Sequence, residues 1–178
     1  MRELTEIRWH ARAGQGAKSA AQILALALLR SGKSVQAFPE YGPERRGAPL
    51  RAYTRFATGR VRRHDSVEEP DLVVVLDDSL LDEPAVREGV TGDTTVLVNT
   101  DQQQPRLDGA RVRAVPTARF AAVGSASFAN VAMLGAVAAA LGEPPLETVQ
   151  EAAVETLGGK VDHDELRAAV AEGYAWRS

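Results

Sequence analysis

The stretch that decides the fold is TEIRWHARAGQGAKSAAQILALALLRSGKSVQAFP, residues 5–39. It opens with a β-type segment at 5–10, passes through a loop of small residues, and continues at 17–30 as an Ala- and Leu-rich segment without Pro or Gly. Gly32 stands where a helix C-terminal cap is expected, and a second short β-type segment follows at 34–39. The order strand, glycine loop, helix, strand predicts a βαβ unit with a right-handed crossover.

The rest of the chain continues this mixture of strands and helices. The apolar run DLVVVL is typical of a central parallel strand, and the alternating segment LRAYTRF of a half-exposed strand. Strands are predicted at 50–56, 71–76, 94–99 and 111–116, and helices at 127–141, from Pro144 and Pro145 to about 157, and from Asp162 towards Trp176. Together they predict one domain over residues 1–178, of the α/β class: a three-layer α/β/α arrangement with a largely parallel, Rossmann-like sheet.

Composition limits the classes of function. The 178 residues carry a net charge of −3, which gives no general electrostatic reason to bind nucleic acid or an anionic membrane. There is no Cys, so the chain can form no disulfide and offers no thiolate to an iron–sulfur cluster. The three His lie far apart in sequence, and no metal site is predicted. Neither an apolar signal core nor a membrane-length apolar run is present, and a cytoplasmic location is expected.

The first candidate site is the glycine loop, residues 11–16, which contains Gly14-Gln15-Gly16 between the first strand and the first helix. Unpaired amides at a helix N-terminus attract phosphate or carboxylate, and glycines let a ligand approach the backbone. The same spacing suits a tight turn that needs glycine for conformation alone. The dinucleotide-binding fingerprint is incomplete because Ser19 replaces its third Gly, and the P-loop pattern is absent.

The second candidate site is FPEYGPERRGAP, residues 38–49, which we call the arginine turn. Its centre is Glu44-Arg45-Arg46-Gly47, and Gly and Pro on both sides predict a rigid turn that presents guanidinium groups. Rigid guanidinium groups favour bidentate recognition of carboxylate or phosphate. The alternative is a surface loop with solvated charges. Because the turn follows the second strand of the βαβ unit, it is expected at the sheet end that holds the glycine loop.

Two further polar features have two interpretations each. Asn130 lies in the Ala-rich helix predicted at 127–141, where a buried amide needs hydrogen-bond partners and an exposed one does not. Asp77 and Asp78 follow the strand predicted at 71–76. They either contact a ligand or cap the next helix.

These motifs, in this order, resemble the gamma subunit of 2-oxoacid:ferredoxin oxidoreductases of the pyruvate and 2-ketoisovalerate type. The family signature HGRGGQG appears as HARAGQG at 10–16, and FPEYGPERRGAP is intact at 38–49. A third element, Asn followed by MLGA on an Ala-rich helix, matches Asn130 and residues 133–136. The resemblance extends over nearly the whole chain and departs from the family pattern where Ala11 and Ala13 replace glycines.

The resemblance implies an enzyme that oxidatively decarboxylates a 2-oxoacid to acyl-CoA and CO2, with iron–sulfur clusters passing electrons to ferredoxin. Thiamine diphosphate and the clusters are implied to lie on alpha, beta and delta-type partner subunits, and coenzyme A (CoA) takes part in the complex. This chain is therefore expected to hold no cofactor alone and to be inactive alone. The resemblance does not select one 2-oxoacid. Our hypothesis is that a set of residues from the motifs holds CoA or forms the active-site wall: Arg12, Gly14, Gln15, Gly16, Glu44, Arg45, Arg46, Gly47 and Asn130.

Two alternatives belong to other classes of protein. The first is a stand-alone nucleotide-binding or regulatory module with a Rossmann-like loop, in which Glu40 occupies the position of a ribose-binding acid. Binding of NAD to the isolated chain would support it. The second is a purely structural scaffold subunit whose motifs pack against partners.

Overall fold

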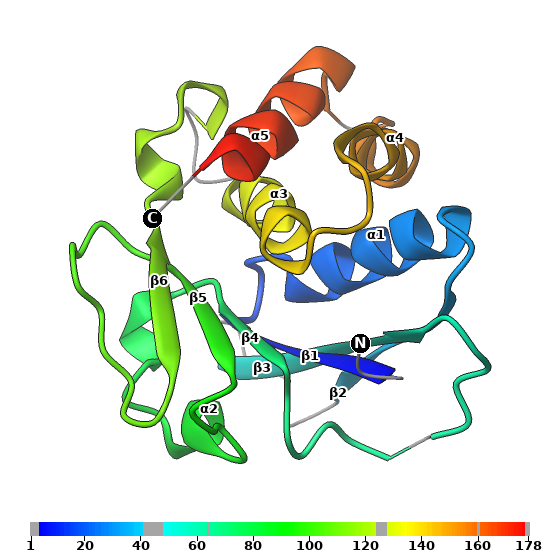
Figure 1. Cartoon of the computed structure of the whole chain (residues 1–178). Helices are drawn as coiled ribbons and strands as arrows, with labels where there is room; N and C mark the ends of the chain where they lie inside the picture. Colours follow the sequence, from blue (N-terminus) through cyan, green and yellow to red (C-terminus); the bar gives the residue numbers. More distant parts are fainter. Residues whose placement is uncertain (1–3, 41–47, 64, 124–127, 160, 177–178) are drawn as a thin grey trace.

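A six-stranded sheet with the strand order β2-β3-β1-β4-β5-β6 lies at the centre of the molecule (Figure 1). The computed structural model describes residues 4–40, 48–63, 65–123, 128–159 and 161–176. β1, β4, β5 and β6 are mutually parallel, while β3 is antiparallel to both of its neighbours, so β2 runs in the direction of β1. The predicted α/β class with a largely parallel sheet is confirmed. The strands are β1 (Leu4–Arg12), β2 (Ser34–Glu40), β3 (Pro49–Ala57), β4 (Leu72–Val75), β5 (Thr95–Asn99) and β6 (Arg111–Val115).

The position of β3 was not predicted. β1, helix α1 (Ala17–Arg30) and β2 follow each other as expected, but β3 lies between the two parallel strands. β2 and β3 form an antiparallel hairpin that is paired from Ser34 opposite Ala57 to Glu40 opposite Arg51. The arginine turn therefore joins the strands of a hairpin at the carboxyl end of β2.

The helices are distributed unequally over the two faces of the sheet. Figure 1 shows α1, α3, α4 and α5 together on one side and the short α2 (Pro84–Arg87) on the other. Among the described residues, the predicted third layer consists of α2 and irregular segments. None of the described helices is long and apolar enough to cross a membrane. The long helices after α1 are α3 (Ala129–Leu141), α4 (Leu146–Leu157) and α5 (His163–Ala175).

The helix-covered face holds the main apolar core. α3 is buried around most of its circumference and packs directly against α5. A Cβ atom on Gly135 would lie 2.0 Å from the carbonyl oxygen of Val170, and one on Gly173 would lie 1.8 Å from that of Ala132. The two backbones are in contact at these glycines, so the Ala- and Gly-rich composition of α3 serves close helix packing.

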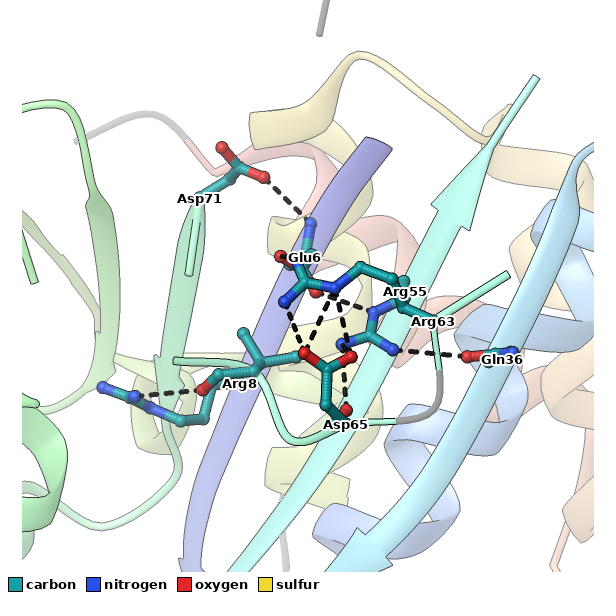
Figure 2. Close-up of polar contacts among 8 residues, drawn as sticks. Glu6, Arg8, Gln36, Arg55, Arg63, Asp65 and Asp71 are labelled. Atoms are coloured by element: carbon teal, nitrogen blue, oxygen red, sulfur yellow. Dashed lines mark hydrogen bonds and ion pairs between the residues drawn. The ribbon is translucent and has the colours of Figure 1, made fainter. Parts of the chain in front are cut away.

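The opposite face of β1 and β3 is charged and also buried (Figure 2). Arg55 is fully buried and donates to Glu6 Oε1 at 2.7 Å and to the Asp65 carbonyl oxygen at 3.0 Å. Arg63 Nη1 lies 3.5 Å from Glu6 Oε2, and the Glu6 amide donates to the Asp71 carboxylate at 2.9 Å. The expectation that β3 is half exposed is therefore wrong, because the connector between β3 and β4 covers this face with its own charged groups.

Candidate functional site

The glycine loop leaves the carboxyl end of β1 and enters α1. Gly14 has φ +100° and Gly16 has φ +81°, the left-handed region that favours glycine. Gly16 is the N-cap of α1, where no side chain caps the helix and no acidic residue occupies the first turn. Glycine is therefore required for conformation here, and the positive end of the helix dipole also lacks a negative side chain of its own.

Residues from the end of β4 hold the glycine loop. The Arg12 amide donates to Gln15 Oε1 at 2.7 Å, and Gln15 Nε2 donates to Asp77 Oδ2 at 2.7 Å. Arg12 Nη2 donates to Ser79 Oγ at 2.8 Å, and its Nε lies 3.4 Å from Asp77 Oδ2. The structure thus brings Arg12 and Gln15 together through a carboxylate and a hydroxyl more than 60 residues away in sequence.

Asp77 caps the turn that follows β4, which is one of its two interpretations. Its carboxylate accepts from the Ser79 amide at 3.1 Å and so caps the single turn at 78–80. Burial raises the pKa of Asp77, but hydrogen bonds from Ser79 and Gln15 and the charge of Arg12 outweigh it and lower the pKa below its usual range. Asp77 is therefore a stable anion at neutral pH. Ser79 was not predicted from the sequence as a site residue. The only indication of such a role in the sequence is its position just after the end of a strand.

Asn130 is buried and lies against the glycine loop. Its side chain is 8% exposed, and Nδ2 donates to the Gly16 carbonyl oxygen at 3.4 Å. A Cβ atom on Gly16 would lie only 2.4 Å from that nitrogen. The structure thereby joins two predicted site residues from different elements, and Gly16 is required for close approach as well as for its backbone conformation.

The ends of the arginine turn are described, whereas Glu44, Arg45, Arg46 and Gly47 lie outside the described residues. Near the end of the turn, the Ala48 carbonyl oxygen accepts from the Ala13 amide at 2.9 Å. This bond joins the end of the arginine turn to the glycine loop.

The base of the hairpin that carries the turn is fixed by a group of charges. Tyr53 donates its hydroxyl proton to Glu40, and Arg51 Nε lies 3.0 Å from Glu40 Oε2. Arg51 also donates to Glu88 at 2.8 Å. Burial, with the Glu40 carboxylate, raises the pKa of Tyr53 to about 12, so its hydroxyl remains a donor at neutral pH.

His10, the first residue of the HARAGQG motif, is buried and neutral. Arg8 Nε donates to His10 Nε2 at 3.0 Å, which places the imidazole proton on Nδ1. Burial lowers the pKa of His10 to about 3, and the charges of Arg8 and Arg51 act in the same direction. A cavity of about 180 Å³ adjoins His10, Glu40, Arg51 and Glu83. The described residues contain no group of three or more His, Cys, Asp or Glu that could hold a metal ion.

Residues 6–176 match the family model described as pyruvate ferredoxin/flavodoxin oxidoreductase. The chain belongs to this family. It is 44% identical over 173 residues to the pyruvate/ketoisovalerate oxidoreductases common subunit gamma of Thermococcus kodakarensis. That alignment covers 93% of this chain and 94% of the relative. The crystal structure of pyruvate oxidoreductase subunit PORC from Thermotoga maritima matches with a TM-score of 0.81 and 39% identity, over 97% of this chain and 96% of that one.

A third comparison concerns the fold alone. The structure of 2-oxoglutarate:ferredoxin oxidoreductase from Magnetococcus marinus, with 2-oxoglutarate, coenzyme A and succinyl-CoA bound, matches with a TM-score of 0.77 at 18% identity. The match covers 98% of this chain and 31% of that chain.

These findings confirm the predicted resemblance: the chain is a gamma-type subunit of a 2-oxoacid:ferredoxin oxidoreductase. The geometry also contradicts the role considered for Glu40 in a stand-alone nucleotide-binding module. In a dinucleotide-binding fold the second strand neighbours the first, but here β3 separates β1 from β2. Glu40 is thereby moved one strand away from the glycine loop, and its carboxylate is bound by Tyr53 and Arg51.

Proposed function

We propose that this subunit binds the anionic part of CoA where the glycine loop and the arginine turn meet, and so forms one wall of the active site. The observation that carries the proposal is the hydrogen bond from the Ala13 amide to the Ala48 carbonyl oxygen. It brings the two anion-seeking motifs side by side at the end of the sheet where α/β proteins bind ligands. In the complex, a 2-oxoacid is oxidatively decarboxylated and its acyl group is transferred to CoA, with ferredoxin as the electron acceptor.

Each motif contributes a different kind of anion contact. The open N-terminus of α1 offers backbone amides and the positive end of the helix dipole to a phosphate. Gly14, whose Cβ position meets nothing within 4 Å, keeps that backbone accessible, and Gly16 leaves room for Asn130. Arg45 and Arg46 add guanidinium groups suited to bidentate phosphate contacts, with Glu44 to orient them and Gly47 to shape the turn.

The remaining candidate residues act by positioning. Arg12 and Gln15 are both bound to Asp77, so they fix the loop. Asn130 fixes the distance between α3 and Gly16, the N-cap of α1.

The cofactors of the reaction are assigned to other subunits in this proposal. When bound, thiamine diphosphate would stabilise the carbanion left by decarboxylation, and iron–sulfur clusters would carry electrons to ferredoxin. Both are placed on alpha, beta and delta-type partners, which fits a chain that has no Cys to ligate a cluster. Residues 1–178 then act as one gamma-type domain whose contribution is to bind and orient CoA.

The test is steady-state kinetics of the assembled complex with Arg45→Ala and Arg46→Ala combined in this subunit. We expect the KM for CoA to rise at least about tenfold, since each charge-assisted hydrogen bond is worth roughly 1.5–3 kcal/mol. The KM for the 2-oxoacid and the subunit stoichiometry should not change. The matched control is Arg60→Ala with Arg62→Ala, two exposed arginines of the connector that make no ion pair with other described residues.

The proposal is wrong if the complex assembles with an unchanged KM for CoA and unchanged turnover. That outcome favours the structural scaffold. Titration of the isolated chain with NAD tests the remaining alternative, because saturable binding would return the chain to the nucleotide-binding class.

A further inference from the structure

The outer edge of the sheet at β6 has no strand beside it among the described residues. The Arg111 amide donates to the Thr94 carbonyl oxygen at 3.1 Å, so the backbone groups of Arg111 face β5. In a parallel ladder the alternate residues face the other way, which turns the amide and carbonyl groups of Val112 and Ala114 outward. Figure 1 shows this edge next to the last described residues of the chain.

Two cavities adjoin this edge, and Trp176 lines both of them. The larger, of about 610 Å³, lies under the segment between β5 and β6, and the smaller, of about 290 Å³, lies between β6 and α3. Trp176 Nε1 donates to the outward carbonyl oxygen of Ala114 at 2.9 Å, and its side chain packs on Phe120 with 5.9 Å between ring centroids. With 37% of its surface exposed, Trp176 is one of the two large apolar side chains exposed among the described residues.

The larger cavity is positively charged. Arg106 and Arg113 line it, are exposed, and form no ion pair with any other described residue. Arg119 also lines it, but its Nε is bound to Asp101 at 2.9 Å. Among the described residues, these two arginines therefore have no counter-charge, and they lie next to the outward backbone groups of Val112 and an exposed indole ring.

From this combination we propose that the β6 edge is the docking surface for an extended, acidic segment of another subunit of the same oxidoreductase. The segment pairs with the outward backbone groups of Val112 and places carboxylates against Arg106 and Arg113. Trp176 is its apolar anchor, since Trp and Arg are the residues most enriched at the energetic centres of interfaces. Charges on an edge strand can also serve only to prevent aggregation, but such charges need neither a cavity nor an aromatic anchor.

This inference goes beyond the proposed CoA site and does not rest on it. It rests on the membership of the chain in a multi-subunit enzyme, in which some surface must contact another subunit. Strand addition is a common way to dock an extended segment, because backbone hydrogen bonds give affinity and flanking pockets give specificity.

The first experiment is photo-crosslinking in the co-expressed, active complex, with a photoreactive phenylalanine analogue in place of Val112. We expect a cross-link to one acidic stretch of another subunit, identified by mass spectrometry. The same analogue at Arg62, on the connector, should not cross-link to that stretch.

The second experiment replaces the charges with Arg106→Glu and Arg113→Glu together. We expect the salt concentration that dissociates the subunit to fall and its affinity for the rest of the complex to drop about tenfold at low salt. The control, Arg60→Glu with Arg62→Glu, changes the net charge equally and should assemble normally. The unfolding temperature of each purified variant separates lost docking from lost folding.

Three results would overturn the inference. One is a cross-link from position 112 only to a second copy of this chain. Another is a Val112 cross-link that reaches no other chain while the complex remains intact. The third is normal assembly of the Arg106→Glu, Arg113→Glu variant, which would assign the cavity to a small anion instead. None of these results changes the KM for CoA expected for the Arg45 and Arg46 variant, so the two proposals fail separately.

Discussion

The two faces of the sheet at β1 are equally buried but are stabilised in opposite ways. Ile7 and Trp9 point into the apolar core under α1, while Glu6, Arg8 and His10 point to the other face; each is less than 9% exposed. On the first face the side chains are held by close packing. On the second, every charged group needs a partner, because a buried charge without one is strongly unfavourable.

Alternation of apolar and charged residues along a strand therefore does not identify its solvent side. Arg8 is an extreme case: its guanidinium donates to backbone carbonyl groups, among them that of Val86 at 3.2 Å, and to His10. Burial lowers its pKa, with nearby charges of both signs acting in smaller measure. The charged face therefore depends on few specific contacts, and the apolar face on many interchangeable ones.

Breaking the central ion pair of the charged face should have the largest effect on stability. Among the described residues, Arg55→Ala leaves the buried Glu6 carboxylate with only the longer ion pair to Arg63, and we expect a loss of about 4 kcal/mol in the free energy of unfolding. Urea unfolding of the purified chain measures it. Arg119→Ala, which removes an exposed ion pair, is the control and should cost less than about 1 kcal/mol.

A double variant sharpens this result. Replacement of the pair by Glu6→Leu with Arg55→Met should recover much of the lost stability, because apolar side chains need no counter-charge. If the double variant is as unstable as Arg55→Ala, the charged face depends on more than the charges of this pair.

On the apolar face, the most sensitive point should be the contact of α3 with α5. Gly173→Ala forces a methyl group against the Ala132 carbonyl group, so the helices must separate, and we expect a loss of about 3 kcal/mol. Gly59→Ala is the matched control, because a Cβ atom there meets nothing within 4 Å and its φ is not positive. Thermal unfolding and urea unfolding should both show that Gly173→Ala is less stable than Gly59→Ala. Equal stabilities would show that the α3–α5 contact yields easily.

The third effect is a pH dependence that belongs only to the charged face. His10 has a pKa of about 3 in the folded chain, below its usual 6.5, so the unfolded state takes up the proton first as the pH falls. The stability from neutral His10 is therefore complete above pH 6.5 and is lost progressively towards pH 3. Between pH 6.5 and 5 the loss should be about 2 kcal/mol. The free energy of unfolding should therefore fall between pH 6.5 and 5 by about this amount more in wild type than in His10→Gln. Equal pH dependence of the two proteins would contradict the assignment.

The smallest effect concerns Asp77, at the edge where the two faces meet the glycine loop. Its pKa is lowered in the folded chain, so the ionised carboxylate stabilises the folded state at pH values above the usual carboxyl pKa. That stabilisation is lost as the pH falls through the pKa of Asp77 in the folded chain. Asp77→Asn should cost less than about 1 kcal/mol at pH 7, because the group is partly solvated. The difference from wild type should shrink below pH 4. A gap that stays constant at low pH would mean that shape, and not charge, is what matters at this position.

Local patterns predicted most of the elements but few of the long-range contacts. The apolar residues of 17–30 and the glycines around them place α1 because helix periodicity and capping are local properties. The insertion of β3 between β1 and β2 pairs residues as far apart in sequence as Leu4 and Ala57, and no local pattern encodes it.

The candidate site follows the same division. Gly14 and Gly16 could be predicted from the strand–loop–helix order. The contact of Gly16 with Asn130 could not, because the two residues are 114 positions apart in sequence. The resemblance to a family joined the three motifs before the structure did, but it did not indicate Ser79 or the burial of Arg55.

The hydrogen bond from Ala13 to Ala48 has a consequence for how this sequence can vary. Both atoms belong to the main chain, so the link is indifferent to side-chain identity. Apart from the glycines, no described residue has a positive φ, so Ala11 and Ala13 adopt conformations open to any amino acid. Replacement of glycine by alanine at these two positions thus leaves the hydrogen bond almost unchanged. Proline at position 13 would remove the donor and so separate the glycine loop from the arginine turn.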